Sequence, residues 1–290
     1  MNIRDLEYIV ETANHKSFSK AASYLYVSQP ALSMQIKKFE DYHNIIIFER
    51  SPHNFIITET GKKVIEIARN LILESRKIKE ISKLSQDKYG GDLKIAAFPT
   101  LAPYFFLKSI PLITKNFNKL KLFLIEEKTH NIIEELKSGN IDIAFLAEHS
   151  YGKEFKSKKV FTEEFLLAVN INHPLAKKKI IKRNDIEGSS LMLLEEGHCL
   201  RNQALEVCDI IGAHENSDFR ASSLETLRQM VAIDAGITLI PEIAAISNKN
   251  IRYLKIKDGA TRTISLVYRK DYYREELVRN IHILIANQLK

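Results

Sequence analysis

The sequence predicts an α/β protein in three parts: a small N-terminal helix-turn-helix domain, one long linker helix, and a two-lobed C-terminal α/β domain. Near the N-terminus, two short helical segments flank a tight turn. After Thr58, apolar residues recur at helical spacing up to about residue 88. From residue 90 onward, apolar strands alternate with helical segments, which is typical of α/β units with a parallel sheet. A chain of 290 residues is long enough for two or three domains.

Three helices are expected at the start of the chain. Apolar spacing predicts the first over residues 3–14, and the run SFS then ends it and caps a short Ala-rich helix over residues 20–26. Ser28 is the expected N-cap of a third helix over residues 29–42. Pro30 falls early in that helix, where a missing N–H costs nothing.

A hairpin and the long helix follow. Strands are expected at residues 45–48 and 55–58, joined by a turn over residues 49–54. The next helix, residues 59–88, carries one apolar stripe, which comprises Val64, Ile67, Ala68, Leu71, Ile72, Ile78, Ile81 and Leu84. The stripe fits a coiled-coil-like dimer helix without strict heptads. The alternative is a surface helix that packs on its own chain.

The rest of the chain predicts two similar halves, which crossovers would join into a hinged pair of lobes with a cleft between them. In the first half, strands are expected at residues 92–98, 121–126 and 141–147, and helices at 102–117 and 131–138. In the second half, strands are expected at 165–169, 190–194, 219–221, 237–240 and 264–268, and helices from 198, at 224–235 and at 274–286.

Composition excludes several classes of protein. No apolar stretch is long enough to span a membrane, and the N-terminal pattern is not that of a signal peptide, so a cytoplasmic protein is expected. There is no P-loop, no G-x-G-x-x-G and no paired-cysteine zinc motif, and the nine His are not at metal-ligand spacing. We therefore expect no metal and no organic cofactor.

The charge alone identifies no partner. A net charge of +7 and a pI near 9.1 permit a polyanion partner. The first 58 residues, however, hold six basic and six acidic side chains, so a nucleic-acid prediction must rest on the motif. On the third helix, Gln29, Ser33 and Lys37 recur every four residues on the outer face, where they can contact base edges and phosphates. The alternative is a plain three-helix bundle with a solvated polar face.

The two cysteines, Cys199 and Cys208, are nine positions apart in the run GHCLRNQALEVC. If this run is helical, they lie on opposite faces and about 13.5 Å apart along the axis. A disulfide needs Cα atoms within about 7 Å, so the pair can bond only if the segment unwinds. They are either inert buried thiols or a redox switch. A helix N-terminus, His198 and Arg201 would favour a Cys199 thiolate, which peroxide oxidises, whereas Cys208 has apolar neighbours.

The segment SFSKAASYLYVSQPALSMQIKKFED, followed by IFER and TETG, resembles the winged-helix DNA-binding domain of LysR-type transcriptional regulators. SGNIDIAF and GITLIPE resemble the effector domain of that family, which is periplasmic-binding-protein-like. Two departures stand out: Asn44 replaces a frequent Gly but suits a left-handed cap, and the wing SPHNF is poor in basic residues.

The LysR resemblance implies a dimer or tetramer, held partly by the long helix, that binds double-stranded promoter DNA and contacts RNA polymerase. The implied DNA-binding residues are Ser28, Gln29, Pro30, Ser33, Lys37 and Arg50. The implied domains are residues 1–58 for DNA binding, 59–89 for the linker helix and 90–290 for regulation. In the last, lobe I spans about 90–163 and 269–290, and lobe II about 164–268.

Within that family, GHCLRNQ, FPTLAPY, EEKTH, FRASSLETLRQMVA and TRTISLVYR resemble the branch that senses hydrogen peroxide. This resemblance implies a regulator, not an enzyme, that hydrogen peroxide switches on and that mainly activates antioxidant genes. It assigns Cys199 as the peroxidatic cysteine and Cys208 as the resolving one, joined by an intramolecular disulfide. The implied peroxide pocket comprises Thr100, Thr129, His198 and Arg262.

Each pocket residue also has a physical role. Thr100 and Thr129 can hydrogen-bond a small polar ligand, His198 can relay a proton, and Arg262 can stabilise a thiolate and a leaving hydroxide. Asn202 stands where the branch commonly has an acid, which should ease thiolate formation. Two alternatives stay open: a LysR-type regulator that binds a metabolite between the lobes, and a thiol peroxidase that carries a DNA-binding domain.

Overall fold

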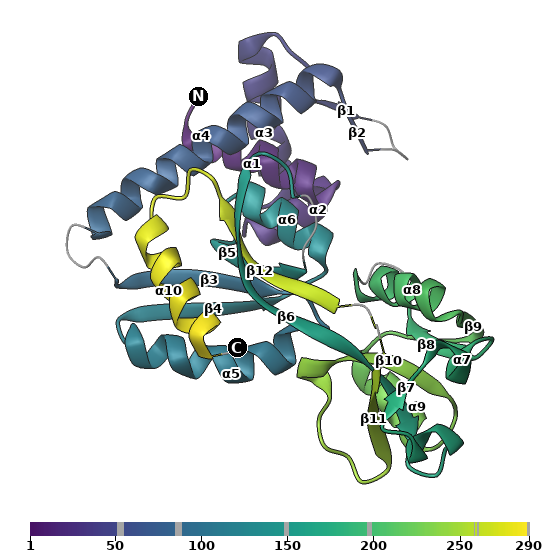
Figure 1. Cartoon of the computed structure of the whole chain (residues 1–290). Helices are drawn as coiled ribbons and strands as arrows, with labels where there is room; N and C mark the ends of the chain where they lie inside the picture. The colour runs from purple at the N-terminus through teal and green to yellow at the C-terminus, as the bar shows by residue number, and fades with distance from the viewer. Residues whose placement is uncertain are drawn as a thin grey trace. The chain divides into compact units, whose positions relative to one another are not determined.

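The computed structural model describes residues 1–50, 55–84, 89–147, 151–195, 199–257, 259 and 261–288. The chain divides into two units, residues 1–87 and residues 88–290 (Figure 1). Within the described ranges, no helix is both long enough and apolar enough to cross a membrane.

The first unit begins with three capped helices: α1 (Ile3–His15), α2 (Phe18–Tyr24) and α3 (Gln29–His43). Asn2 and Asp5 form a capping box on α1, and Ser28 accepts a hydrogen bond from the Ala31 N–H at the start of α3. α2 starts before residue 20, where it was predicted to begin, because the Ser17 hydroxyl caps it by accepting from the Lys20 N–H. Asn44 ends α3 with a φ of 51°, which confirms the left-handed cap.

The wing is shorter than predicted. β1 (Phe48–Arg50) and β2 (Phe55–Ile57) pair antiparallel, so the predicted strand over 45–48 is wrong except at its last residue. The cause is Glu40, whose buried carboxylate accepts hydrogen bonds from the Ile47 and Phe48 N–H groups at 2.7 and 3.1 Å. Residues 49 and 50 of the predicted turn lie in β1, and residues 51–54 lie outside the described part of the chain.

The long helix α4 (Glu59–Leu84) has two apolar faces rather than one. Ile65, Ala68 and Ile72 are buried in the core of the first unit, so part of the helix packs on its own chain. Ile67, Leu71 and Ile78 are 60%, 41% and 71% exposed. At 100° per residue, these three side chains lie within about 40° of one another, on a second face. The predicted end of the helix, residues 85–88, lies outside the described residues.

The second unit holds a ten-stranded sheet, with strand order β4-β3-β5-β12-β6-β10-β8-β9, β11 on β6 and β7 on β11. The strands are β3 (Gly91–Ala97), β4 (Leu120–Glu126), β5 (Ile143–Ala147), β6 (Phe155–Asn170), β7 (Ile180–Ile181), β8 (Ser190–Leu194), β9 (His214–Ala221), β10 (Ile237–Pro241), β11 (Ile251–Ile256) and β12 (Thr261–Arg269). The helices are α5 (Ala102–Asn116), α6 (Thr129–Lys137), η1 (Pro174–Lys177), α7 (Arg183–Ile186), α8 (Cys199–Ile211), α9 (Leu224–Ala232), η2 (Glu242–Ala244) and α10 (Glu275–Gln288).

The sheet is mixed rather than parallel, which corrects the prediction. β3 pairs parallel with β4 and β5, and β8 pairs parallel with β9 and β10. β6 and β12, however, run antiparallel to each other, and β12 is also antiparallel to β5. β6 was predicted only over 165–169, because its charged first half, FKSKKVFTEE, lacks an apolar signal.

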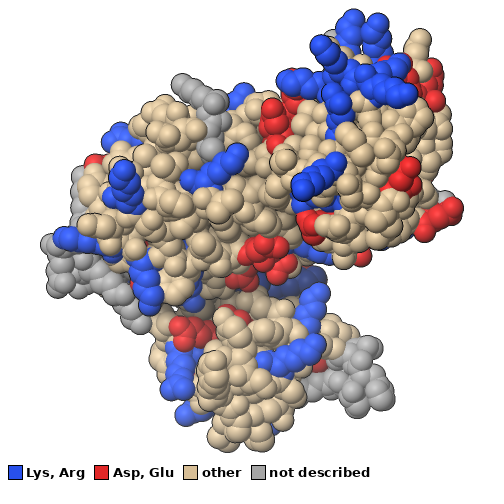
Figure 2. Space-filling view, turned by 90° about the horizontal axis from the view of Figure 1, so that it is seen from below, with Lys and Arg blue, Asp and Glu red and all other residues tan. Residues whose placement is uncertain are grey.

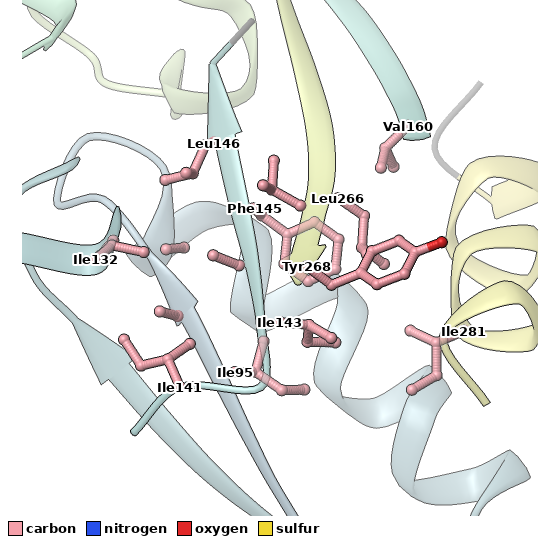
Figure 3. Close-up of a cluster of buried hydrophobic side chains, with 14 of the residues drawn as sticks. Ile95, Ile132, Ile141, Ile143, Phe145, Leu146, Val160, Leu266, Tyr268 and Ile281 are labelled. Carbon is pink, nitrogen blue, oxygen red and sulfur yellow. The ribbon is translucent and has the colours of Figure 1, made fainter. Parts of the chain in front are cut away.

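Two hydrophobic cores define the lobes of this unit. Lobe I contains β3, β4, β5 and β12 with α5, α6 and α10, and Figure 3 shows Phe145, Leu266, Tyr268 and Ile281 of its core packed together. Lobe II contains β7 to β11 with α7, α8 and α9. β12 covers residues 261–269 and packs in the lobe I core, so the predicted C-terminal boundary of lobe II at residue 268 is wrong. β6 belongs to both lobes, since its first half pairs with β12 and its second half with β10 and β11.

Candidate functional site

The N-terminal end of α3 presents a polar face to solvent. Ser28, Gln29, Pro30 and Lys37 are exposed and Ser33 is half-buried. The Gln29 side-chain amide donates to the Ser33 hydroxyl at 3.0 Å. On the opposite side Leu32, Ile36 and Phe39 are buried, as the predicted helix-turn-helix requires. The side chain of Arg50 lies outside the part of the chain that the structure describes.

One residue of this region was not singled out from the sequence. Tyr26 is 96% exposed, and its backbone lies in the left-handed region with a φ of 56°. It stands in the turn between α2 and α3, directly before the exposed start of α3.

Figure 2 shows Lys and Arg interspersed with Asp and Glu over one face of the chain, with a denser basic group at its upper right.

α8 carries both cysteines. It begins at Cys199 and ends at Ile211, so Cys208 lies in the same helix and the predicted helical spacing between the two cysteines is confirmed. With this helix intact, the two Cα atoms are too far apart to bond. His198 and the side chain of Cys199 lie outside the described residues.

The environment of Cys208 is that of a resting thiol. Cys208 is a free cysteine, 2% exposed, and packs in the lobe II core. Burial raises the pKa of its thiol to about 11, and the Asp209 and Glu215 carboxylates add to the shift. At neutral pH the thiol is therefore protonated and unreactive while α8 is folded.

An ion pair ties the first turn of α8 to the sheet. Arg201 Nη2 lies 2.6 Å from a Glu215 carboxylate oxygen on β9, and Arg220 Nε lies 3.3 Å from the other oxygen. The pairing of β9 with β8 shifts register between Leu191 and Leu193, so the segment that carries Glu215 is irregular.

Three of the four predicted pocket residues lie at one edge of the lobe I sheet. Thr100 and Thr129 each follow the end of a strand by three residues, and those strand ends, Ala97 and Glu126, are paired neighbours. Arg262 lies on β12, two residues from the partner of Ala147 at the end of β5. Carboxyl ends of parallel strands are the usual place for ligands in open α/β sheets.

Hydrogen-bond donors at this edge lack partners. Within the part of the chain that the structure describes, the Thr100 and Thr129 hydroxyls and the Nη1 and Nη2 atoms of Arg262 are buried with no hydrogen-bond partner. Thr100 and Arg262 are each 2% exposed. Since an unsatisfied buried polar group costs about 1–3 kcal/mol, this group of donors favours a small oxygen-rich ligand.

Glu163 orients the Arg262 guanidinium. Its carboxylate lies 2.8 Å from Arg262 Nε, with the two side chains 4% and 0% exposed, and also accepts the Ile243 N–H at 2.7 Å. The guanidinium carbon is 5.5 Å from the centre of the Phe98 ring. Because Glu163 holds Nε, both terminal nitrogens stay available to an oxygen that gains negative charge. Sequence reasoning missed Glu163, whose partners are distant in the chain.

Comparisons with known proteins agree with these features. Residues 3–62 match the family model for the bacterial regulatory helix-turn-helix protein, lysR family, and residues 86–290 match the LysR substrate binding domain. The hydrogen peroxide-inducible genes activator of Haemophilus influenzae is 41% identical over 273 residues, covering 93% of this chain and 91% of the relative. The DNA-binding transcriptional dual regulator OxyR of Escherichia coli is 40% identical, covering 93% of this chain and 90% of that protein.

Solved structures agree as well. A full-length OxyR variant from Pseudomonas aeruginosa superposes with a TM-score of 0.76 at 28% identity, covering 98% of this chain and 94% of that one. The matches confirm the resemblance and the expected architecture, and they confirm a regulator rather than an enzyme. The chain therefore belongs to the LysR family of bacterial helix-turn-helix transcription regulators.

Proposed function

We propose that this regulator senses hydrogen peroxide through Cys199 and Cys208 and mainly activates antioxidant genes in the cytoplasm. The observation that carries the proposal is α8, which starts at Cys199 and buries Cys208 as a protonated thiol. Support comes from the unpartnered donors of Thr100, Thr129 and Arg262. The Haemophilus relative, a hydrogen peroxide-inducible genes activator, supports the same signal.

The proposed chemistry has two steps. The Cys199 thiolate attacks one peroxide oxygen, the O–O bond breaks, and a sulfenic acid forms while the other oxygen leaves as hydroxide and takes a proton to become water. The Cys208 sulfur then attacks the sulfenic sulfur, loses its proton, and releases a second water as the disulfide forms. The two thiols are oxidised by two electrons and peroxide is reduced to two waters.

The pocket residues have separate roles in the first step. The Thr100 and Thr129 hydroxyls bind and orient the peroxide, and Arg262 Nη1 and Nη2 stabilise the oxygen that leaves with negative charge. His198 relays the proton. Asn202, which is neutral, leaves the Cys199 thiolate without a nearby repelling carboxylate.

Disulfide formation requires α8 to unwind, since its nine-residue spacing holds the two cysteines about 13.5 Å apart along the axis. The covalent bond is compatible only with the refolded segment, so it shifts the equilibrium of the regulatory domain. This refolding changes the contacts between protomers and thereby the spacing of the DNA-reading helices.

DNA binding and assembly use the first unit. Promoter DNA is contacted by residues at the exposed start of α3 and on the wing: Ser28, Gln29, Pro30, Ser33, Lys37 and Arg50. The exposed face of α4, with Ile67, Leu71 and Ile78, joins protomers into a dimer or tetramer that contacts RNA polymerase. We assign residues 1–58 to DNA binding, 59–89 to the linker helix and 90–290 to regulation.

The test is a peptide mass map of reduced protein after about one equivalent of hydrogen peroxide, with free thiols alkylated. A link between the Cys199 and Cys208 peptides within seconds is expected. Cys208→Ser should stop at the sulfenic acid, and Cys199→Ser should not react. Two thiols still alkylated after minutes would contradict the proposal and leave a metabolite-binding LysR regulator as the better assignment.

A further inference from the structure

One buried arginine joins the two lobes. Arg228 lies on α9 of lobe II and is 4% exposed. Its Nη2 donates to the Tyr104 hydroxyl at 3.1 Å and to the Ala244 carbonyl at 2.7 Å. Tyr104 belongs to the first turn of α5 in lobe I, yet its ring packs against the lobe II core. The guanidinium carbon lies 5.7 Å from the centre of that ring.

The contact continues to Arg262 through η2. Ala244 and Ile243 are adjacent in this short helix, and Ile243 packs against both lobe cores. Arg228 holds the Ala244 carbonyl, while the Glu163 carboxylate accepts the Ile243 N–H at 2.7 Å and pairs with Arg262. A continuous path of polar contacts therefore runs from Arg262 through Glu163, η2 and Arg228 to Tyr104.

The Tyr104 end of this path of polar contacts reaches Thr100. Tyr104 stands four residues after Thr100, and the turn between them is fixed because the Leu101 and Ala102 N–H groups both donate to the Phe98 carbonyl at 2.9 Å. A shift of Tyr104 therefore moves the backbone that carries Thr100. This path of polar contacts passes through lobe II and links Arg262 to Thr100, two residues at the lobe I edge whose donors lack partners among the described residues.

We propose that Arg228 is a positioning residue for the reaction with peroxide: it fixes Thr100 relative to Arg262 and to the lobe that carries Cys199, without touching the peroxide. This inference rests on the proposed function. Buried hydrogen bonds from a charged donor are short and directional, which suits them to fixing a geometry. A misplacement of about 1 Å can cost about 100-fold in rate.

The test uses three variants of the full-length reduced protein. Tyr104→Phe removes the acceptor and keeps the ring, and Arg228→Met removes the charged donor. Lys255→Met is the matched control, because Lys255 on β11 of lobe II is 61% exposed and pairs with Glu164, so its loss removes a cation from lobe II and leaves the cross-lobe contacts in place. For each protein, two rate constants are measured at one pH: disulfide formation with hydrogen peroxide, and alkylation of Cys199 by iodoacetamide.

With peroxide, we expect Tyr104→Phe to react about 10-fold and Arg228→Met about 100-fold more slowly than the parent. Alkylation should stay within about twofold in every variant, and the pH midpoint of the peroxide reaction should not move, because the Cys199 thiolate itself is unchanged. Lys255→Met should match the parent in both reactions. This pattern separates positioning from a general loss of structure, which would alter both reagents.

Two outcomes overturn the inference alone: Tyr104→Phe reacts with peroxide as fast as the parent, or peroxide and iodoacetamide slow in parallel. If Arg228→Met does not fold, Tyr104→Phe decides, since its ring still fills the site. A parent chain that forms no disulfide overturns the proposed function, and this inference with it.

Discussion

The carboxyl edge of lobe I and helix α8 of lobe II are held in place in different ways. At the lobe I edge, Arg262 of β12 and Glu163 of β6 are buried cross-strand partners on two long paired strands. α8 packs on its own lobe through Leu200, Ala204 and Val207, and its first turn is tied to the sheet by the Arg201–Glu215 pair. A rigid site suits recognition of a small molecule, whereas a helix with few polar ties can refold.

The largest expected effect is on the rigid edge. Glu163→Gln should lower the free energy of unfolding by about 3–5 kcal/mol, because it leaves the buried Arg262 charge without its partner. The measurement is urea unfolding of the reduced protein. The control is Glu164→Gln at the next position, where an exposed pair with Lys255 is removed and less than about 1 kcal/mol should be lost. Equal losses in the two variants would show that the edge is no more rigid than the surface.

Alkaline pH should destabilise lobe II through Cys208. The folded-state pKa of this thiol is about 11, above the value of about 8.5 for an unfolded thiol. Its contribution to stability is therefore complete below about pH 8.5 and is lost as the pH rises through 11. The urea midpoint of the parent relative to Cys208→Ala should fall over this range. A difference that does not change with pH would mean that the thiol is not buried in the folded state.

Loosening α8 should favour the oxidised form. Glu215→Gln removes a partly buried ion pair that the unwound segment does not need, and the dithiol–disulfide equilibrium should shift about fivefold toward the disulfide, equivalent to about 1 kcal/mol. Titration in a thiol redox buffer measures the ratio. Arg220→Gln, which removes the longer and more exposed contact, should shift it less. A shift toward the dithiol would mean that the Arg201–Glu215 ion pair stabilises the refolded, disulfide-bonded form instead.

The smallest effect on stability is expected at Thr100. Thr100→Val keeps the shape of the side chain and removes a hydroxyl with no partner among the described residues, so stability should stay equal or rise by up to about 1 kcal/mol. Peroxide oxidation of Cys199 should nevertheless slow about 10-fold. Thermal unfolding and stopped-flow oxidation measure the two quantities. A destabilised variant that oxidises at the parent rate would assign the hydroxyl to structure rather than to peroxide.

Local signals predicted much of the fold. Ser28 and Pro30 marked the start of α3, and the run SLMLL marked β8 with its bounds, because caps and short apolar runs act within a few residues. The failures were non-local. The apolar run after Asn44 was not a strand because Glu40 binds its backbone, and the charged half of β6 is a strand because β12 pairs with it.

The candidate site divides in the same way. The helical spacing of Cys199 and Cys208 followed from the sequence. The roles of Thr100, Thr129 and Arg262 came from resemblance to a family, not from any pattern in the residues. Glu163 and Arg228 were missed because their partners, Arg262 and Tyr104, are distant in sequence and close only in the folded chain. Short-range periodicity carries no information about such pairs.

The place of β12 in the sheet affects how the protein is made. Lobe I begins at β3, but β12, the strand that pairs with β5, and the covering helix α10 come last in the chain. On the ribosome, the DNA-binding unit and the lobe II strands therefore emerge while β5 still has a bare edge, which invites pairing with other chains. Translation that stops early leaves a DNA-binding unit attached to an unfinished sensor. Such a product exposes its unpaired edge to chaperones and proteases, so only complete chains should persist to occupy promoters.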